Sequence, residues 1–308
     1  MKYLKLIRYQ NLLLLAFMQL IFRYGFLKLQ NIYLSLADWQ YGLLVLSTLL
    51  IAAAGYVIND IMDQETDNDN NPNDVIIGNS ISENRAYNIY VALNVMGVGI
   101  GFYISNVIQK PSFAAIFIVI AATLYLYATS LKQMLLVGNI IVALLLSISV
   151  IIIGVFDLLP ATYEGNQAIM SIMFKILIDY AVFAFILNFI REIVKDMEDV
   201  NGDYNQGMST LPIALGLEKT SKVAFGLLAI SIVVLLFYIN SNLMAFKLYF
   251  ATLYALILVV GPMIFCLIKM WSAKTQKEFK LISNVLKLVI FFGILSILII
   301  NLNIRYNA

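Results

Sequence analysis

Acidic residues gather in two polar stretches of the chain, and their spacing suits metal binding. Steps of three or four residues connect the members of each set, which are Asn59, Asp60, Asp63 and Asp67 in the first stretch and Glu192, Asp196, Asp199 and Asp203 in the second. On an α-helix, such steps place side chains on one face. Like charges on one face destabilise an isolated helix, so we expect a divalent cation to offset them.

The available donor atoms narrow the choice of metal. The chain has no His, and its one cysteine, Cys266, lies inside an apolar run, which excludes a disulfide framework and any His/Cys metal site. Carboxylate and amide oxygens without nitrogen or sulfur ligands suit Mg2+. We therefore predict a Mg2+ site whose ligands are Asn59, Asp60, Asp63, Asp67, Asp196, Asp199 and Asp203. A solvated acidic loop is the alternative for either stretch alone, but the repeated pattern argues against it for both.

The elements that carry these residues are predicted to be membrane-spanning helices. Of the 308 residues, 62% are hydrophobic and only 12% are charged, and the mean hydropathy is +0.89. Apolar runs of about 20 residues, the length that a bilayer core requires, recur throughout. We therefore predict an all-α, multi-pass integral membrane protein whose residues 1–308 form one bundle and one domain. The net charge of +2 and the lack of an Arg-rich stripe exclude a nucleic-acid partner.

Nine spans are expected from hydropathy, at residues 11–30, 40–60, 85–106, 111–130, 136–157, 168–190, 221–240, 246–268 and 281–303. The first is interrupted by Arg23 and Lys28, and the sixth by Lys175 and Asp179. Placing the N-terminus in the cytoplasm puts most Lys and Arg of the connecting segments on that side, as the positive-inside rule requires. Both acidic stretches then lie at the cytoplasmic face.

Both polar stretches are interpreted as loops that leave a helix. The first begins as a continuation of the second span and is expected to break at Pro72 and Gly78. The second is expected to break at Gly202, Gly207 and Pro212. Polar loops of this kind are typical of functional sites.

The motifs resemble those of the UbiA superfamily of intramembrane prenyltransferases. The first runs from Asn59 through Asp60, Asp63 and Asp67 to Asn71-Pro72. The second runs from Asp196 through Asp199, Asp203 and Gly207 to Thr210-Leu211-Pro212. The likeness covers the whole chain and extends to Arg8 and Asn11, to Tyr127 and Lys132, and to Gly138-Asn139.

The resemblance implies transfer of a polyprenyl group from a prenyl diphosphate to a hydrophobic acceptor, with the diphosphate bound through Mg2+ between the two motifs. Asp63, Asp196 and Asp199 are then the expected catalytic residues. Lys132, Arg191 and Lys195 are expected to contact the diphosphate, and Asn11 and Tyr127 to contact substrate. The second motif is most similar to the branch of archaeal-lipid ether synthases and chlorophyll synthases. Acceptor identity, prenyl chain length, protein partners and oligomeric state are not set by these residues.

Two other functions stay open at this point. An ion or metabolite transporter would use carboxylates at membrane depth, for which Asp179 is the one good candidate. A catalytically impaired member of the family is suggested by Asn73-Asp74, which stand where relatives commonly carry Arg or Lys.

Overall fold

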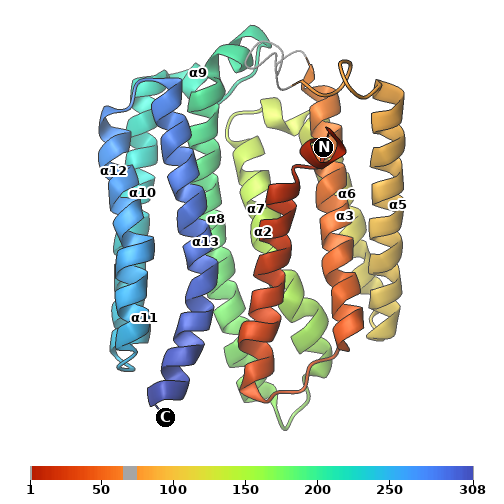
Figure 1. Cartoon of the computed structure of the whole chain (residues 1–308), viewed down its shortest axis with the longest axis vertical. Helices are drawn as coiled ribbons and strands as arrows, with labels where there is room; N and C mark the ends of the chain where they lie inside the picture. Colours follow the sequence, from red (N-terminus) through yellow and green to blue (C-terminus); the bar gives the residue numbers. More distant parts are fainter. Residues whose placement is uncertain (1, 65–74, 308) are drawn as a thin grey trace.

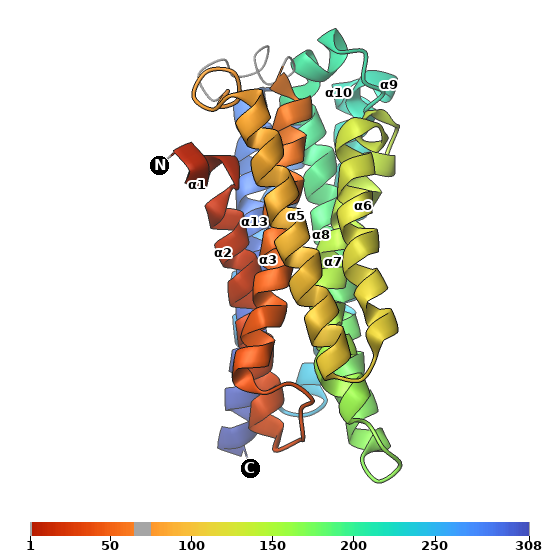
Figure 2. The same cartoon turned by 90° about the vertical axis from the view of Figure 1, so that its right-hand side faces the viewer.

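The structure, a computed structural model, describes residues 2–64 and 75–307. Over this part of the chain its regular elements are helices, apart from an isolated bridge between Ile77 and Ile81, and nine helical segments are long and apolar enough to cross a membrane. The predicted nine spans are therefore confirmed for the described residues. Figures 1 and 2 show the helices running side by side along one long axis.

The first half of the bundle begins with the short α1 (Lys2–Leu6) and α2 (Tyr9–Leu20), which continues through a π-helical turn and a 3-10 turn to Gln30. It then contains α3 (Asp38–Met62), α5 (Glu83–Val107), α6 (Ala114–Thr129) and α7 (Val137–Ile153), with α7 extended by irregular turns to Ala161.

The second half contains α8 (Gln167–Asn205), the short α9 (Leu211–Leu215) and α10 (Leu217–Ile239), which a π-helical turn extends to Met244. The eighth span joins α11 (Tyr249–Tyr254) to α12 (Gly261–Ser272) through a π-helical segment, and α13 (Gln276–Asn307) closes the bundle.

Two apolar cores hold the helices together, and α8 belongs to both. One core includes Phe22, Phe156 and Leu177 and joins α8 to the first half of the bundle. The other includes Ile193, Met263 and Leu286 and joins α8 to α10, α12 and α13. Because α8 is packed on both sides, its side chains are fixed in position relative to both halves.

α8 is also longer than a membrane requires. Its 39 residues extend about 58 Å, whereas about 20 residues cross a bilayer core. The apolar part ends near Ile190, so the segment from Arg191 to Asn205 projects beyond the span as a continued helix. The predicted break at Gly202 is wrong: Gly202 is buried within the helix, and packing outweighs the roughly 1 kcal/mol by which glycine weakens a helix. The helix instead ends just before Gly207, whose φ of +67° suits a left-handed residue after a helix end.

The first polar stretch is only partly described. α3 ends at Met62, and Asp63 is the residue that follows its last turn. Three positions from the sequence analysis lie outside the described residues. They are the predicted ligand Asp67, the expected break at Pro72, and Asp74, which stands where relatives commonly carry Arg or Lys. At the other expected break, Gly78 has a φ of +85° in the turn that leads toward α5.

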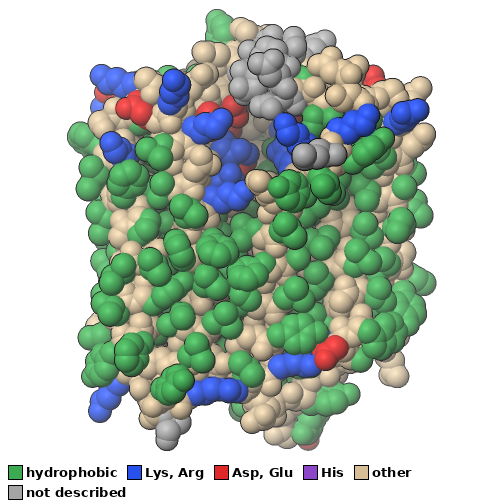
Figure 3. All heavy atoms as spheres, viewed as in Figure 1, with side chains coloured by type: hydrophobic (Ala, Val, Ile, Leu, Met, Phe, Trp, Pro, Cys, Tyr) green, Lys and Arg blue, Asp and Glu red, His purple; other side chains and the backbone are tan. Residues whose placement is uncertain are grey.

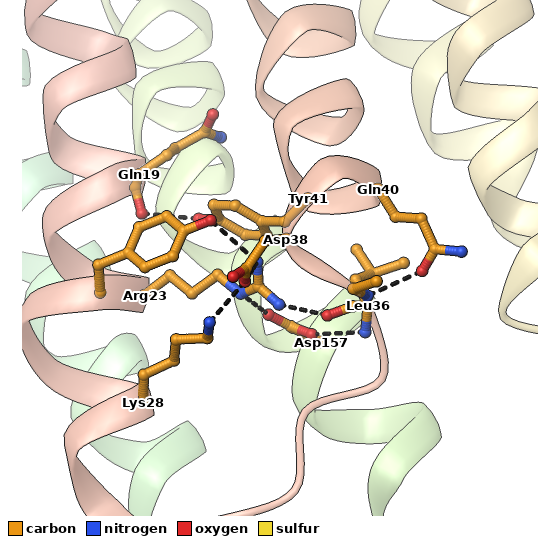
Figure 4. A network of polar contacts seen from close by, with 10 residues as sticks. Gln19, Arg23, Lys28, Leu36, Asp38, Gln40, Tyr41 and Asp157 are labelled. Atoms are coloured by element: carbon orange, nitrogen blue, oxygen red, sulfur yellow. Dashed lines mark hydrogen bonds and ion pairs between the residues drawn. The ribbon is translucent and has the colours of Figure 1, made fainter.

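The end of the bundle opposite the polar stretches is closed by a buried ion-pair network (Figure 4). Arg23, only 1% exposed, pairs with Asp157 at 2.7 Å and with Asp38 at 3.2 Å, and its guanidinium lies 4.3 Å from the centre of the Tyr41 ring. Asp157 also accepts a hydrogen bond from the backbone N–H of Leu36 at 2.9 Å. The charge that interrupts the first predicted span is thus neutralised by groups on neighbouring segments.

Candidate active site

The first acidic cluster lies where α3 ends, beside the junction of α1 and α2. Asp60 accepts a hydrogen bond from the Arg8 guanidinium at 3.0 Å, and that guanidinium lies 5.1 Å from the centre of the Tyr56 ring. Arg8 has a φ of +48°, an uncommon conformation for a residue with a side chain. The junction between the two short helices therefore aims the Arg8 side chain at the end of α3.

Asp63 is held from two sides. The Lys132 ammonium donates to one carboxylate oxygen, and the Asn59 side-chain amide donates to the other. The remaining oxygen of Asn59, Oδ1, is buried and has no hydrogen-bond partner among the described residues. An unpaired buried acceptor is costly, and an amide oxygen beside a carboxylate is a normal pair of Mg2+ ligands. These residues therefore fit a divalent cation.

Lys132 owes its position to close packing of its backbone. It lies in a 3-10 turn, Leu131–Gln133, between α6 and α7. A Cβ on Gly138, at the start of α7, would lie only 2.9 Å from the Cα of Lys132, so only glycine allows this approach. The carbonyl of Gln133 accepts a hydrogen bond from the backbone N–H of Ser209 at 3.0 Å. The turn thus connects the first cluster to the segment that follows α8.

The second acidic cluster lies on the projecting part of α8. Asp196 accepts a hydrogen bond from the side-chain amide of Asn139 on α7 at 2.8 Å. Burial raises the pKa of Asp199 to about 6 and that of Asp203 to about 7, and at Asp203 the nearby charges of Asp199 and Asp63 add to the rise. α3 and α8 end at the same end of the bundle (Figure 1), and Asp63 and Asp203 lie within range for their charges to repel. A cation between them would relieve this repulsion.

The predicted phosphate-binding residues also lie together at this end. Arg191 and Lys195 both contact Glu192, at 3.4 Å and 3.0 Å, and Glu192 is buried. Tyr127 on α6 lies within electrostatic range of Glu192 and Asp63, between the two clusters. These positions are suited to the predicted contacts with a diphosphate and with substrate.

Asn11, the other predicted substrate contact, lies on α2 and accepts a hydrogen bond from the ammonium of Lys287 at 2.7 Å. Lys287 is on α13, and sequence reasoning placed it only among loop cations. It also did not single out Asn139 as the partner of Asp196. No pattern of spacing connects such distant positions, so only the fold shows that they meet.

The described carboxylates do not converge on one point as a ready-made cluster of three. Instead, each of Asp60, Asp63 and Asp196 is held by a cation or an amide, and a cavity beside the first cluster is lined by residues that include Asp63, Lys132 and Gln206. Mg2+ takes one or two protein carboxylates per ion and completes its shell with phosphate oxygens and water. The arrangement fits ions that bind together with a phosphorylated substrate.

Comparison with known proteins gives consistent results. The sequence pattern of the UbiA prenyltransferase family matches residues 25–297. A digeranylgeranylglyceryl phosphate synthase from Saccharolobus solfataricus is 30% identical over 299 residues, which cover 96% of this chain and 95% of that protein. A second enzyme of that name, from Sulfolobus acidocaldarius, is 36% identical over 60% of this chain and 62% of its own length.

Solved structures show the same fold. A structure reported for digeranylgeranylglyceryl phosphate synthase in membranes superposes with a TM-score of 0.63 at 22% identity and covers 97% of each chain. A UbiA homolog from Archaeoglobus fulgidus bound to DMAPP and Mg2+ gives a TM-score of 0.56 at 17% identity and covers 96% of this chain and 99% of that one.

Proposed function

The chain belongs to the UbiA prenyltransferase family, and from this premise we propose that it transfers a geranylgeranyl group from its diphosphate to geranylgeranylglyceryl phosphate. It is a multi-pass membrane enzyme of the prenyltransferase class. One observation carries the proposal for the site: the turn that holds Lys132 against Asp63 of the first cluster also bonds to Ser209, just after the second cluster on α8. We also propose that residues 1–308 form a single domain.

Mg2+ is the cation that these oxygen ligands would hold. Asn59, Asp60 and Asp63 would bind it on one side and Asp196, Asp199 and Asp203 on the other, with Asp67 as a further predicted ligand. When bound, Mg2+ neutralises the diphosphate and stabilises it as a leaving group. The homolog bound to DMAPP and Mg2+ supports this assignment.

The chain's own residues then position the reacting groups. Lys132, Arg191 and Lys195 would donate to phosphate oxygens of the diphosphate, and their present contacts with Asp63 and Glu192 keep them at this end of the bundle. The bond between the prenyl C1 and the diphosphate oxygen breaks, and its electron pair leaves with pyrophosphate. The acceptor hydroxyl oxygen bonds to C1, and its proton passes to the departing pyrophosphate. Tyr127 and the apolar helices around it would shield the allylic carbon from water.

The acceptor is inferred from the relatives. Both curated relatives described above are named for synthesis of digeranylgeranylglyceryl phosphate, and the first aligns over nearly the full length of both chains. A product of that name forms when a second geranylgeranyl group joins geranylgeranylglyceryl phosphate. We propose that the site faces the cytoplasm, with the N-terminus on the same side, as the distribution of Lys and Arg favours.

A direct assay tests the proposal. Purified protein in detergent or vesicles, given geranylgeranyl diphosphate, geranylgeranylglyceryl phosphate and Mg2+, should release pyrophosphate and form the diether product. Asp63→Ala and Asp199→Ala should abolish turnover, whereas Asp38→Asn, at the opposite end of the bundle, should retain it. Unchanged turnover in both alanine variants would refute the metal-site assignment. Transfer to an aromatic acceptor only would refute the choice of acceptor.

The orientation has its own test. Single cysteines introduced at positions 79 and 204, in a Cys266→Ser background, should react with a membrane-impermeant reagent from the cytoplasmic side. Both positions are exposed at the end of the bundle that carries the acidic clusters. Labelling of both from the other side would refute the proposed orientation.

A further inference from the structure

Three cations on two helices lie near one another at the membrane side of the acidic clusters. Arg191 and Lys195 on α8 both contact Glu192, and Lys287 on α13 lies within electrostatic range of both cations. Among the described residues, Lys287 forms no ion pair with a carboxylate and donates instead to Asn11 on α2. We call Arg191, Lys195 and Lys287 the inner cations.

Arg191 and Lys287 lie deeper in the molecule than the predicted metal ligands on α8. Arg191 precedes Asp199 by eight residues on the same helix, which corresponds to about 12 Å along its axis toward the membrane. α13 is anchored to α8 at this level, because the Arg191 guanidinium donates to the carbonyl of Ser283 at 3.3 Å. Lys287 lies one helical turn further toward the membrane than Ser283.

Figure 3 shows that this region opens to the surface. The face is hollowed near the polar end between α13 and α2, and Lys and Arg side chains gather in the hollow, with apolar side chains below it. The bond between Lys287 and Asn11 joins α13 to α2. An amphiphile could therefore place its head group among these cations and its chain against the apolar surface.

Excess positive charge beside the membrane is costly unless an anion balances it. A phosphate monoester carries a charge of about −1.5 to −2 at neutral pH and would supply such an anion. The donor diphosphate already has expected partners in the acidic clusters, Arg191 and Lys195. Of the inner cations, Lys287 is therefore the one left for a second anion that needs no metal.

We propose that Lys287 forms the subsite for the phosphate of the acceptor lipid, next to the Arg191 that the donor diphosphate is expected to use. This inference rests on the proposed function, because it assumes an acceptor with a phosphate head group. In a glycerol phosphate, the phosphate and a hydroxyl stand on adjacent carbons. Anchoring the phosphate at Lys287 would hold that hydroxyl between Lys287 and the metal-bound donor. The subsite selects lipid phosphates over uncharged acceptors of the same length.

Steady-state kinetics separate this role from binding of the donor. Lys287→Gln should raise the KM for geranylgeranylglyceryl phosphate roughly 10- to 100-fold, the loss expected for a charge-assisted hydrogen bond, while the KM for geranylgeranyl diphosphate stays within about twofold. Lys287→Arg should restore most of the acceptor affinity. Lys277→Gln, on an exposed turn of the same helix, is the matched control. A higher KM for the donor, or an unchanged KM for the acceptor, would overturn the proposal.

A binding measurement distinguishes failure of this inference from failure of the proposed function. In detergent, 1-oleoyl-glycerol 3-phosphate should raise the melting temperature of the wild type and of Lys277→Gln by roughly 3 °C at saturation, and that of Lys287→Gln by much less. Monooleoylglycerol, which lacks the phosphate, is the control ligand. If this difference is seen without prenyl transfer, the anion subsite stands and the proposed function fails. If transfer occurs but the phosphate lipid stabilises all variants equally, the subsite is refuted.

Discussion

Replacing Gly138 by alanine tests whether the packing of one turn controls the first acidic cluster. The added Cβ would lie 2.9 Å from the Cα of Lys132 and 3.3 Å from its carbonyl oxygen. Ordinary contacts between carbon atoms are about 3.5–4.0 Å, so the turn must move by about 0.6 Å or more. Backbone atoms cannot rotate out of the way, and the shift therefore carries the Lys132 ammonium away from Asp63.

The expected loss of activity follows from the strength of the bond between Lys132 and Asp63. Lys132 and Asp63 form a charge-assisted hydrogen bond in a partly buried setting, and such bonds contribute about 1.5–3 kcal/mol. Misplacement by a fraction of an ångström near reacting groups forfeits much of such a contribution. We expect kcat/KM for the prenyl diphosphate to fall roughly 10- to 100-fold in Gly138→Ala, which is about 1.4–2.7 kcal/mol in the activation barrier.

Pyrophosphate release at saturating Mg2+ and acceptor measures this loss. Gly99→Ala is the matched control, because a Cβ at that helical glycine meets nothing within 4 Å. The double variant Gly138→Ala/Lys132→Met should have nearly the same kcat/KM as Lys132→Met alone, because both changes remove the same interaction. Activity within about twofold of the Gly99→Ala control, or a fully additive double variant, would refute the reasoning.

Other sites give further predictions. Chelation of divalent cations should abolish turnover and added Mg2+ should restore it, and Asn59→Leu should raise the Mg2+ concentration for half-maximal activity, whereas Asn59→Asp should not. Asn139→Ala, which frees Asp196 from its amide donor, should lower kcat by roughly 10-fold with little change in melting temperature. Arg23→Met leaves Asp157 buried without its partner and should cost about 3–5 kcal/mol of stability, seen as a lower melting temperature. Because that network lies far from the site, an altered donor KM in Arg23→Met would contradict this account.

The sequence predicts the bundle well, because span length and apolar composition are imposed by the bilayer rather than by the particular fold. It also predicts that the acidic side chains of α8 share one helix. It does not predict that this helix continues past Gly202, because the packing that buries Gly202 comes from elements distant in the chain. A prediction from helix propensity alone therefore ends α8 too early.

Charged residues inside the spans show a second limit of sequence reasoning. Arg23 is read as an interruption of a span, yet Asp157, more than 130 residues later, neutralises it. Lys287 is read as one more loop cation, yet it meets Asn11 across 276 positions. The role of a charged residue near a predicted span end can be inferred only when its partner is known. No local sequence pattern identifies that partner.

Charge is arranged in opposite ways at the two ends of the bundle. At the closed end, Arg23 is surrounded by carboxylates, a carbonyl and an aromatic ring, so the network holds α2, α3 and α7 together without needing a ligand. At the other end, Arg191 and Lys195 share the buried Glu192 on the membrane side of α8, and Asp196, Asp199 and Asp203 lie beyond them. Lys287 on α13 donates to the amide oxygen of Asn11 and not to a carboxylate among the described residues. Metal ions with a diphosphate would stabilise the carboxylates, and the acceptor phosphate would pair with Lys287, so the position of Lys287 relative to α8 would set where donor and acceptor head groups lie.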